Sequence, residues 1–320
     1  MKRSGLIVLL NVVLSATVLT GCIRKRPPND DIPPTPPPAN FPAVPDGPSL
    51  NFLVIGDWGT AGLGQREVAR AISKTHEAAP PDFVLTVGDN IYPSGVSGPN
   101  DPYWQTHFER VYVGPFWDDL EFYPTFGNHD HMGSLEGQIE YSKVSPRWHF
   151  PSPYYSLNKE IPGGGTALFL ALDTDPMAKK GPRGAEEQVL WADSILYWDD
   201  SDWTVVYGHH PLISGGWHRP DNSVVRVVLP ILEGTTDLYM AGHNHTTELI
   251  EMGFGTTQVV CGGGGGTDNA YSVRPVEGTL ASFSNGGWCY VRVWKDTLAV
   301  ELYDRGGGLQ YRHLIPKRKE

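Results

Sequence analysis

Five segments of this chain share one construction: an apolar run, then a glycine, then a side chain that can bind a metal. They occupy residues 52–57, 83–89, 122–129, 204–209 and 238–245. The β-branched and aromatic residues in these runs are typical of buried strands. A glycine at a strand end allows a sharp turn and a close approach of the backbone to a ligand. Because polar groups at the carboxyl ends of neighbouring strands converge on one crevice, the pattern predicts a single site built from several strands.

Segments with helical periodicity separate these strands, as connections between parallel strands require. The spacing of apolar residues predicts helices over residues 65–77 and 186–198, and a shorter one over 224–232. After Gly242 the sequence becomes strand-rich, with strands predicted at residues 248–252, 257–261, 288–294, 297–303 and 309–314. We therefore expect a mixed α/β domain in which two sheets face each other and helices lie outside.

The charge and the cysteine content exclude several classes of function. The chain has 25 basic and 36 acidic residues, for a formal net charge of −11, which argues against a nucleic-acid-binding surface. An acidic substrate would then need a local source of positive charge, which metal ions would supply. Three cysteines are too few for a disulfide scaffold or a cysteine-built zinc site. Cys261 and Cys289 fall on predicted strands, where a disulfide and two buried thiols are both consistent with the sequence.

The first part of the chain predicts export and attachment to a membrane. Residues 1–21 resemble a secretory signal, because Lys2 and Arg3 precede an apolar stretch that is too short to span a bilayer. Leu-Thr-Gly-Cys at 19–22 resembles the bacterial lipoprotein cleavage box, which predicts a lipid on Cys22 and a place in the bacterial cell envelope. A plain signal with an incidental cysteine is the alternative. Residues 22–49 are rich in proline and predict an extended tether. Residues 50–320 are predicted to form one domain.

Taken together, the five motifs resemble those of the metallophosphoesterases. They are Gly-Asp-Trp-Gly at 56–59, Gly-Asp-Asn-Ile-Tyr at 88–92, Gly-Asn-His-Asp at 127–130, Gly-His-His-Pro at 208–211 and Gly-His-Asn-His at 242–245. Tyr92, three residues after Asp89, resembles the purple acid phosphatases, especially the small tartrate-resistant type. The resemblance covers the chain from Asn51 to about Tyr311. It implies a sandwich of two mixed β-sheets flanked by helices.

The resemblance also implies two metal sites that share one carboxylate. The implied ligands of the first metal are Asp57, Asp89, Tyr92 and His245. Those of the second metal are Asp89, Asn128, His209 and His243, so that Asp89 bridges the two. Two carboxylates and a phenolate suit Fe(III) in the first site, and the more neutral second set suits Fe(II), Zn(II) or Mn(II). The ligands alone do not choose among the three divalent ions.

The implied reaction is hydrolysis of a phosphomonoester by attack of metal-bound hydroxide. His129 is the predicted general acid for the leaving group, with Asp130 expected to orient it by a hydrogen bond. The alternative for His129 is a loop histidine that only positions phosphate. His218, in a glycine-rich loop, is a further predicted substrate-side histidine.

Two other functions remain consistent with the sequence. A phosphodiesterase or nucleotidase would use the same scaffold, although Tyr92 disfavours it because related diesterases usually lack this tyrosine. A lipoprotein that binds metal or phosphate without turnover is disfavoured by the complete ligand set and by His129. The sequence does not specify the physiological substrate or the oligomeric state.

Overall fold

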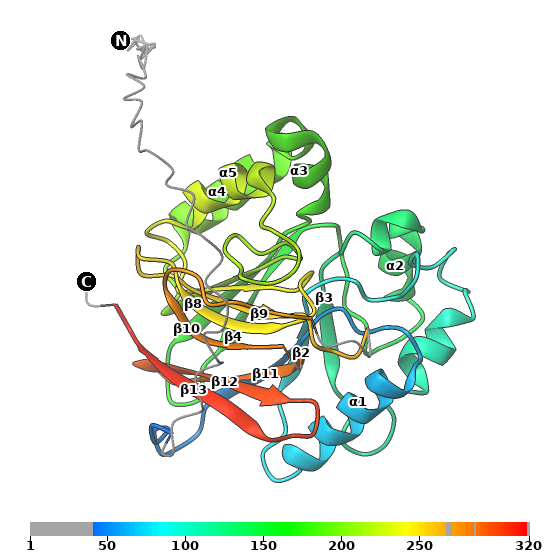
Figure 1. Ribbon diagram of the computed structural model, residues 1–320, viewed down its shortest axis with the longest axis horizontal. Helices are drawn as coiled ribbons and strands as arrows, with labels where there is room; N and C mark the ends of the chain where they lie inside the picture. Colours follow the sequence, from blue (N-terminus) through cyan, green and yellow to red (C-terminus); the bar gives the residue numbers. More distant parts are fainter. Residues whose placement is uncertain (1–40, 267–270, 285, 319–320) are drawn as a thin grey trace, which may run out of the picture. The chain divides into compact units, whose positions relative to one another are not determined.

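A computed structural model describes residues 41–266, 271–284 and 286–318 (Figure 1). The predicted signal, the lipidation residue Cys22 and the first part of the predicted tether lie outside these residues. The described end of the tether contacts the domain: Arg312 Nη1 donates to the carbonyl of Pro42 at 3.0 Å and Trp294 Nε1 to that of Gly47 at 3.4 Å. Across the described ranges, the helices are all too short or too polar to cross a membrane.

The first sheet combines a parallel half with an antiparallel half. Its strands are β1 (Leu50–Ile55), β2 (Phe83–Thr86), β3 (Glu121–Pro124), β11 (Gly287–Val293), β12 (Thr297–Asp304) and β13 (Leu309–Pro316). They are ordered β13-β12-β11-β1-β2-β3. Strands β1, β2 and β3 run parallel, whereas β11 pairs antiparallel with β1. The carboxyl ends of β1, β2 and β3, where three of the five motifs begin, therefore meet at one edge.

The second sheet has a parallel centre. Its strands are β4 (Tyr155–Glu160), β5 (Thr166–Ala171), β6 (Trp203–Tyr207), β7 (Leu238–Ala241), β8 (Thr247–Glu251), β9 (Thr257–Cys261) and β10 (Thr279–Phe283). They are ordered β10-β8-β9-β7-β6-β5-β4, with β5, β6, β7 and β9 parallel. Two mixed sheets are thus present, which confirms the predicted fold class.

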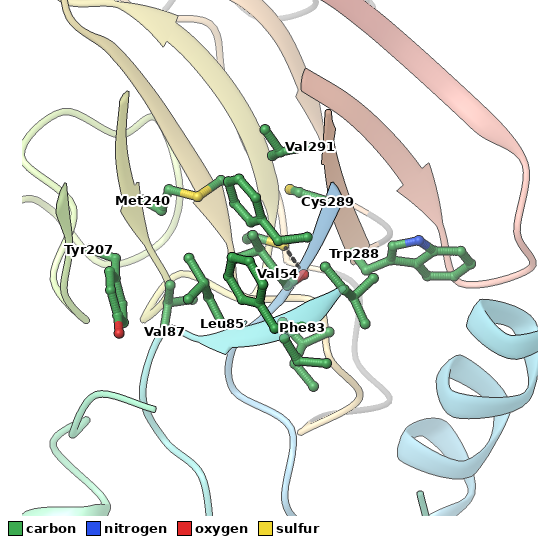
Figure 2. Close-up of a cluster of buried hydrophobic side chains, with 14 of the residues drawn as sticks. Val54, Phe83, Leu85, Val87, Tyr207, Met240, Trp288, Cys289 and Val291 are labelled. Carbon is green, nitrogen blue, oxygen red and sulfur yellow. Dashed lines mark hydrogen bonds between the residues drawn. The ribbon is translucent and has the colours of Figure 1, made fainter. Parts of the chain in front are cut away.

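The main core lies between the two sheets. Phe52 and Phe83 of the first sheet each meet Phe169 of the second edge-on, with ring centroids 5.2 Å apart. Figure 2 shows apolar side chains from strands of both sheets, such as Val54 and Met240, packed into this layer. Strand β7 is buried along its whole length, so its sequence Leu-Tyr-Met-Ala is a continuous apolar run rather than an alternating one.

The two cysteines of the domain belong to this inter-sheet core, and both are buried free thiols. The thiol of Cys261 donates to the carbonyl of Val54 at 3.2 Å and thus reaches from β9 to β1. Burial and the neighbouring Cys261 raise the pKa of the Cys289 thiol well above its ordinary value. Of the two alternatives that the sequence allowed, the structure has the buried thiols.

Helices cover the outer faces of the sandwich. They are α1 (Leu63–Thr75), α2 (Leu135–Tyr141), α3 (Asp175–Lys180), α4 (Glu186–Trp198) and α5 (Asn222–Leu232), with short turns η1 (Trp104–Glu109), η2 (Asp130–Met132) and η3 (Gly181–Gly184). Figure 1 shows α3, α4 and α5 on the outer side of the second sheet and α1 beside the first. Helix α5 begins where Asp221 accepts hydrogen bonds from the backbone N–H groups of Ser223 and Val224. The helices predicted at 65–77, 186–198 and 224–232 correspond to α1, α4 and α5.

Candidate metal centre

The predicted ligands lie on loops that follow strands of both sheets. Asp57, Asp89 and Asn128 follow β1, β2 and β3 of the first sheet, while His209 and His243 follow β6 and β7 of the second. The backbone of three of these residues is left-handed, with φ of 54° at Asp57, 50° at Asp89 and 66° at His243. Such backbone is costly for residues other than glycine and concentrates at functional sites. The loops therefore hold their ligands in a conformation that local propensity alone would not select.

The implied ligands of the first metal converge on the hydroxyl of Tyr92. Its Oη lies 2.9 Å from Asp89 Oδ2, 3.3 Å from Asp57 Oδ1 and 3.3 Å from His245 Nε2. His245 Nε2 also lies 3.3 Å from Asp57 Oδ1. The four side chains thus direct their donor atoms at one small region.

The implied ligands of the second metal form an adjoining group. Asn128 Oδ1 lies 3.1 Å from His209 Nε2 and 3.0 Å from His243 Nδ1, and the two imidazole nitrogens are 3.3 Å apart. His209 Nε2 is 3.6 Å from Asp89 Oδ1, which places Asp89 between the two groups. His209 Nδ1 lies 2.9 Å from the carbonyl of Val87. A proton on Nδ1 satisfies that carbonyl and leaves the Nε2 lone pair directed into the site.

The chemistry of these groups fits a pair of cations. Asp57 and Asp89 are 0% and 2% exposed, and two adjacent buried carboxylates are costly unless positive charge compensates them. One oxygen of Asp57, one of Asp89 and one nitrogen of His209 lie within 4.8 Å of one another, so donor atoms from both implied groups form one compact cluster that could hold metal. In the second group, an amide oxygen and two imidazole nitrogens lie within 3.3 Å of one another. Oxygen and nitrogen donors of this kind suit iron, zinc and manganese.

The two buried carboxylates also affect the protonation of Tyr92. Burial and the carboxylates of Asp57 and Asp89 raise the pKa of the Tyr92 phenol well above its ordinary value. An ionised Tyr92 therefore requires a cation whose charge outweighs both carboxylates.

His129 lies at the edge of this centre, but its orientation has a different source from the one predicted. Its Nδ1 lies 2.6 Å from the carbonyl of Pro93, and its ring centroid is 4.5 Å from that of Tyr92. Its backbone N–H donates to Asp89 Oδ1 at 2.9 Å. The Pro93 carbonyl thus holds the proton on Nδ1, so that Nε2 is the nitrogen available to a substrate.

Asp130 was expected to orient His129, and the structure differs. The Asp130 carboxylate is fully buried and accepts from the backbone N–H of Gly127 at 2.8 Å and of Asn90 at 3.1 Å, and from Gln138 Nε2 at 2.7 Å. A buried carboxylate needs several donors, and among the described residues its hydrogen bonds go to these groups, whereas His129 Nδ1 pairs with the carbonyl of Pro93. Asp130 therefore fastens the turn at Gly127 to the segment that follows Asp89.

His218 lies beside the second group, with its ring centroid 4.6 Å from that of His243. Its loop is held by Asn244, whose Oδ1 accepts from the His218 N–H at 2.7 Å and whose Nδ2 donates to the His218 carbonyl at 2.8 Å. Asn90 and Asn244 are buried site residues to which no role was assigned from the sequence. Both lie within the sequence motifs, between two implied ligands, and this position was the signal that could have identified them.

Comparison with known proteins agrees with this geometry. The chain belongs to the calcineurin-like phosphoesterase family, whose model matches residues 50–247. Among curated proteins, it is 32% identical over 310 residues to the human tartrate-resistant acid phosphatase type 5, covering 87% of this chain and 95% of the human one. It is 30% identical over 291 residues to purple acid phosphatase 7 of Arabidopsis thaliana, covering 84% and 87%. These relatives confirm the resemblance to the purple acid phosphatases.

Solved structures share the fold. The GAP50 anchor protein of the inner membrane complex of Plasmodium superposes with a TM-score of 0.78 at 24% identity, over 86% of this chain and 90% of that one. The purple acid phosphatase PPD1 of yellow lupin superposes with a TM-score of 0.64 at 16% identity, over 85% of this chain and 54% of that one. At these identities, the two structures establish the fold alone.

Proposed function

We propose that this protein is a dinuclear-metal acid phosphatase that hydrolyses phosphomonoesters. The observation that carries the proposal is the convergence of Asp57, Asp89 and His245 on the hydroxyl of Tyr92, beside the group of Asn128, His209 and His243. Family membership and the acid phosphatase relatives support the same reaction.

Bound in this centre, two cations would lower the pKa of a water molecule and neutralise charge on the phosphoryl oxygens. Asp89 holds the two groups together, because its oxygens face both Tyr92 and His209. A protonated His129 carries its second proton on Nε2, since Nδ1 is held by the carbonyl of Pro93. That proton is the one available to the leaving-group oxygen, which departs poorly as an alkoxide.

The assay that tests this proposal compares p-nitrophenyl phosphate with bis(p-nitrophenyl) phosphate at acidic to neutral pH. A monoesterase hydrolyses the first with the higher kcat/KM. Preference for the bis ester would support the phosphodiesterase alternative. Binding of metal and phosphate without turnover of either ester would support the non-catalytic lipoprotein.

We further propose Fe(III) in the first site and Fe(II), Zn(II) or Mn(II) in the second. The first group contributes two carboxylates and a phenol, whose ionisation needs a highly charged cation. The second contributes a neutral amide, two neutral imidazoles and a share of Asp89, which suits a divalent ion.

The first assignment predicts a coloured protein. Coordination of the Tyr92 phenolate to Fe(III) gives a broad charge-transfer band in the visible spectrum. Tyr92→Phe removes the phenolate and keeps the ring, so we expect the band to disappear while the far-UV circular dichroism is unchanged. Asp57, Asp89 and His245 still hold the metal, so the iron content should stay near that of the wild type. An iron-loaded, oxidised wild type without the band, or a band that survives Tyr92→Phe, would contradict the tyrosinate site.

We also propose that Cys22 bears a lipid that attaches the domain to the bacterial cell envelope. The support is the apolar segment and the Leu-Thr-Gly-Cys sequence at 19–22. Two or more acyl chains anchor a protein stably, whereas one chain holds it only marginally. Cys22→Ala is expected to block processing or to move the enzyme from the membrane fraction to the soluble fraction. Normal cleavage with unchanged membrane attachment would refute the proposal.

A further inference from the structure

The segment that follows β5 contains two buried carboxylates that hold a histidine outside the implied ligand set. His131 Nε2 lies 2.9 Å from Asp173 Oδ1, and His131 Nδ1 lies 3.4 Å from Asp175 Oδ2. Asp173 and Asp175 are 4% and 2% exposed. His131 belongs to the same turn as Asn128, since its backbone N–H donates to the carbonyl of Gly127 at 3.2 Å. The two carboxylates therefore fix one side of the turn that presents Asn128.

The residue between these two carboxylates holds another implied ligand of the second metal. Thr174 Oγ1 accepts from the backbone N–H of His209 at 3.3 Å and from that of His210 at 3.2 Å. The same hydroxyl lies 2.8 Å from His210 Nδ1. Thr174 is fully buried, so these contacts are shielded from water.

The segment itself is fixed from both sides. Gln188 of α4 accepts from the N–H of Asp173 at 2.8 Å and donates to its carbonyl at 2.9 Å. Thr125 Oγ1, at the end of β3, donates to the carbonyl of Leu172 at 2.7 Å. A segment held in this way does not adjust freely when one of its contacts is lost.

We infer that residues 173–175 form a brace that sets the position of Asn128 relative to His209, and that His131 and Thr174 are positioning residues for the second metal. The inference rests on the proposed function, because it uses the ligand assignment made there. In the described structure, the side-chain contacts of the brace reach the Asn128 turn and His209 but not Asp57, Tyr92 or His245. Its loss should therefore affect the second metal selectively.

The other anchor of the same turn explains why the first metal should be spared. Asp130 ties the turn to the backbone of Asn90, next to Asp89, and within the described residues its hydrogen bonds do not involve His131. Removing His131 leaves this anchor in place, so Asp89 keeps its neighbours. Loss of His131 should therefore shift Asn128 and leave the implied ligands of the first metal in place.

The test is a metal-binding measurement on the full-length protein with the variant His131→Ala. Partners that orient a metal ligand typically contribute about 10–100-fold to metal affinity. We expect Zn²⁺ to bind the second site about 10–100-fold more weakly, while the first metal stays near one per chain and the visible band of the iron-loaded protein is unchanged. His149→Ala is the matched control, because it removes a histidine that lies 3.5 Å from Glu121 at the surface.

The outcomes separate the inference from the proposed function. A wild type that binds fewer than two metals contradicts the ligand assignment. A wild type that binds two, with an unchanged second affinity in His131→Ala, overturns the brace. Parallel loss of both metals also overturns it, because that result indicates a general loss of stability.

A second variant covers the case in which His131→Ala does not fold. Thr174→Val keeps the side-chain shape and removes the hydroxyl that accepts from His209, so it should give the same selective loss. If both residues act through one segment, the fold-losses in the double variant should combine to less than their product. A full product would show two independent contacts and would contradict a shared brace.

Discussion

Asp89→Ala is expected to remove both metals and to lower kcat/KM by more than about 10³-fold, since even residues that only orient a ligand contribute about 10–100-fold. Asp89 is the implied ligand that the two groups share, with its oxygens 2.9 Å from Tyr92 Oη and 3.6 Å from His209 Nε2. Its loss takes one negative charge from each coordination sphere. It also removes the acceptor of the His129 backbone N–H and so should loosen the turn that carries the proposed general acid.

Asn128→Ala is the control for this prediction. Asn128 contacts His209 and His243 and belongs to the second group alone. Its loss should mainly weaken the divalent metal and leave the first metal bound. Metal analysis of the dialysed proteins and steady-state kinetics measure both effects. An Asp89→Ala protein that keeps two metals per chain would show that the bridging assignment is wrong.

The second large effect concerns His129. We expect His129→Ala to lower kcat for alkyl phosphates by about 10²–10⁴-fold, the range of a positioned general acid. The loss for p-nitrophenyl phosphate should be small, because p-nitrophenolate leaves without protonation. The comparison needs one enzyme preparation and two substrates that differ in the pKa of the leaving group.

An equal loss on both substrates would support the alternative role of His129, in which the histidine only positions phosphate. His313→Ala is the control, since His313 lies on β13, a strand that carries none of the implied ligands. Its kinetics should match the wild type for both substrates. The metal content of the His129→Ala protein should also be measured. If it equals that of the wild type, the lower kcat comes from loss of the histidine and not from loss of the metals.

The elements nearest the site could be predicted because their sequences are unambiguous. Strands β2, β6 and β7 are buried along their whole length, and each has a largely apolar sequence that is followed within two residues by a glycine. Helix α4 was predicted with the bounds that the structure has. Strand β5 was missed because its Ala-Leu-Phe-Leu-Ala sequence has neither alternation nor β-branched residues to separate strand from helix. The short helices α2 and α3 depend on contacts distant in the chain and were missed as well.

Almost all of the site residues that could be predicted belong to the five sequence motifs. The family resemblance carried by the five motifs implied the ligands, and the structure brings those residues together. The role of Asp130 did not follow, because adjacency to His129 in the sequence suggested a contact that the fold does not make. Its actual partners, Asn90 and Gln138, come from segments that the sequence pattern does not connect. Thr174 carried no signal, since a threonine after a strand is common in loops.

The division of the ligands between the two sheets has a consequence for maturation. Asp57, Asp89 and Asn128 come from the first sheet, and His209 and His243 from the second, so neither sheet alone offers a complete coordination sphere. A chain in which one sheet has formed and the other has not would present only weak, partial chelation. We therefore expect metal capture to be a late event, with its binding energy gained only when the two halves have docked. Correctly assembled molecules are therefore expected to retain their metals, and molecules in which the two sheets have misassembled are expected to lose them.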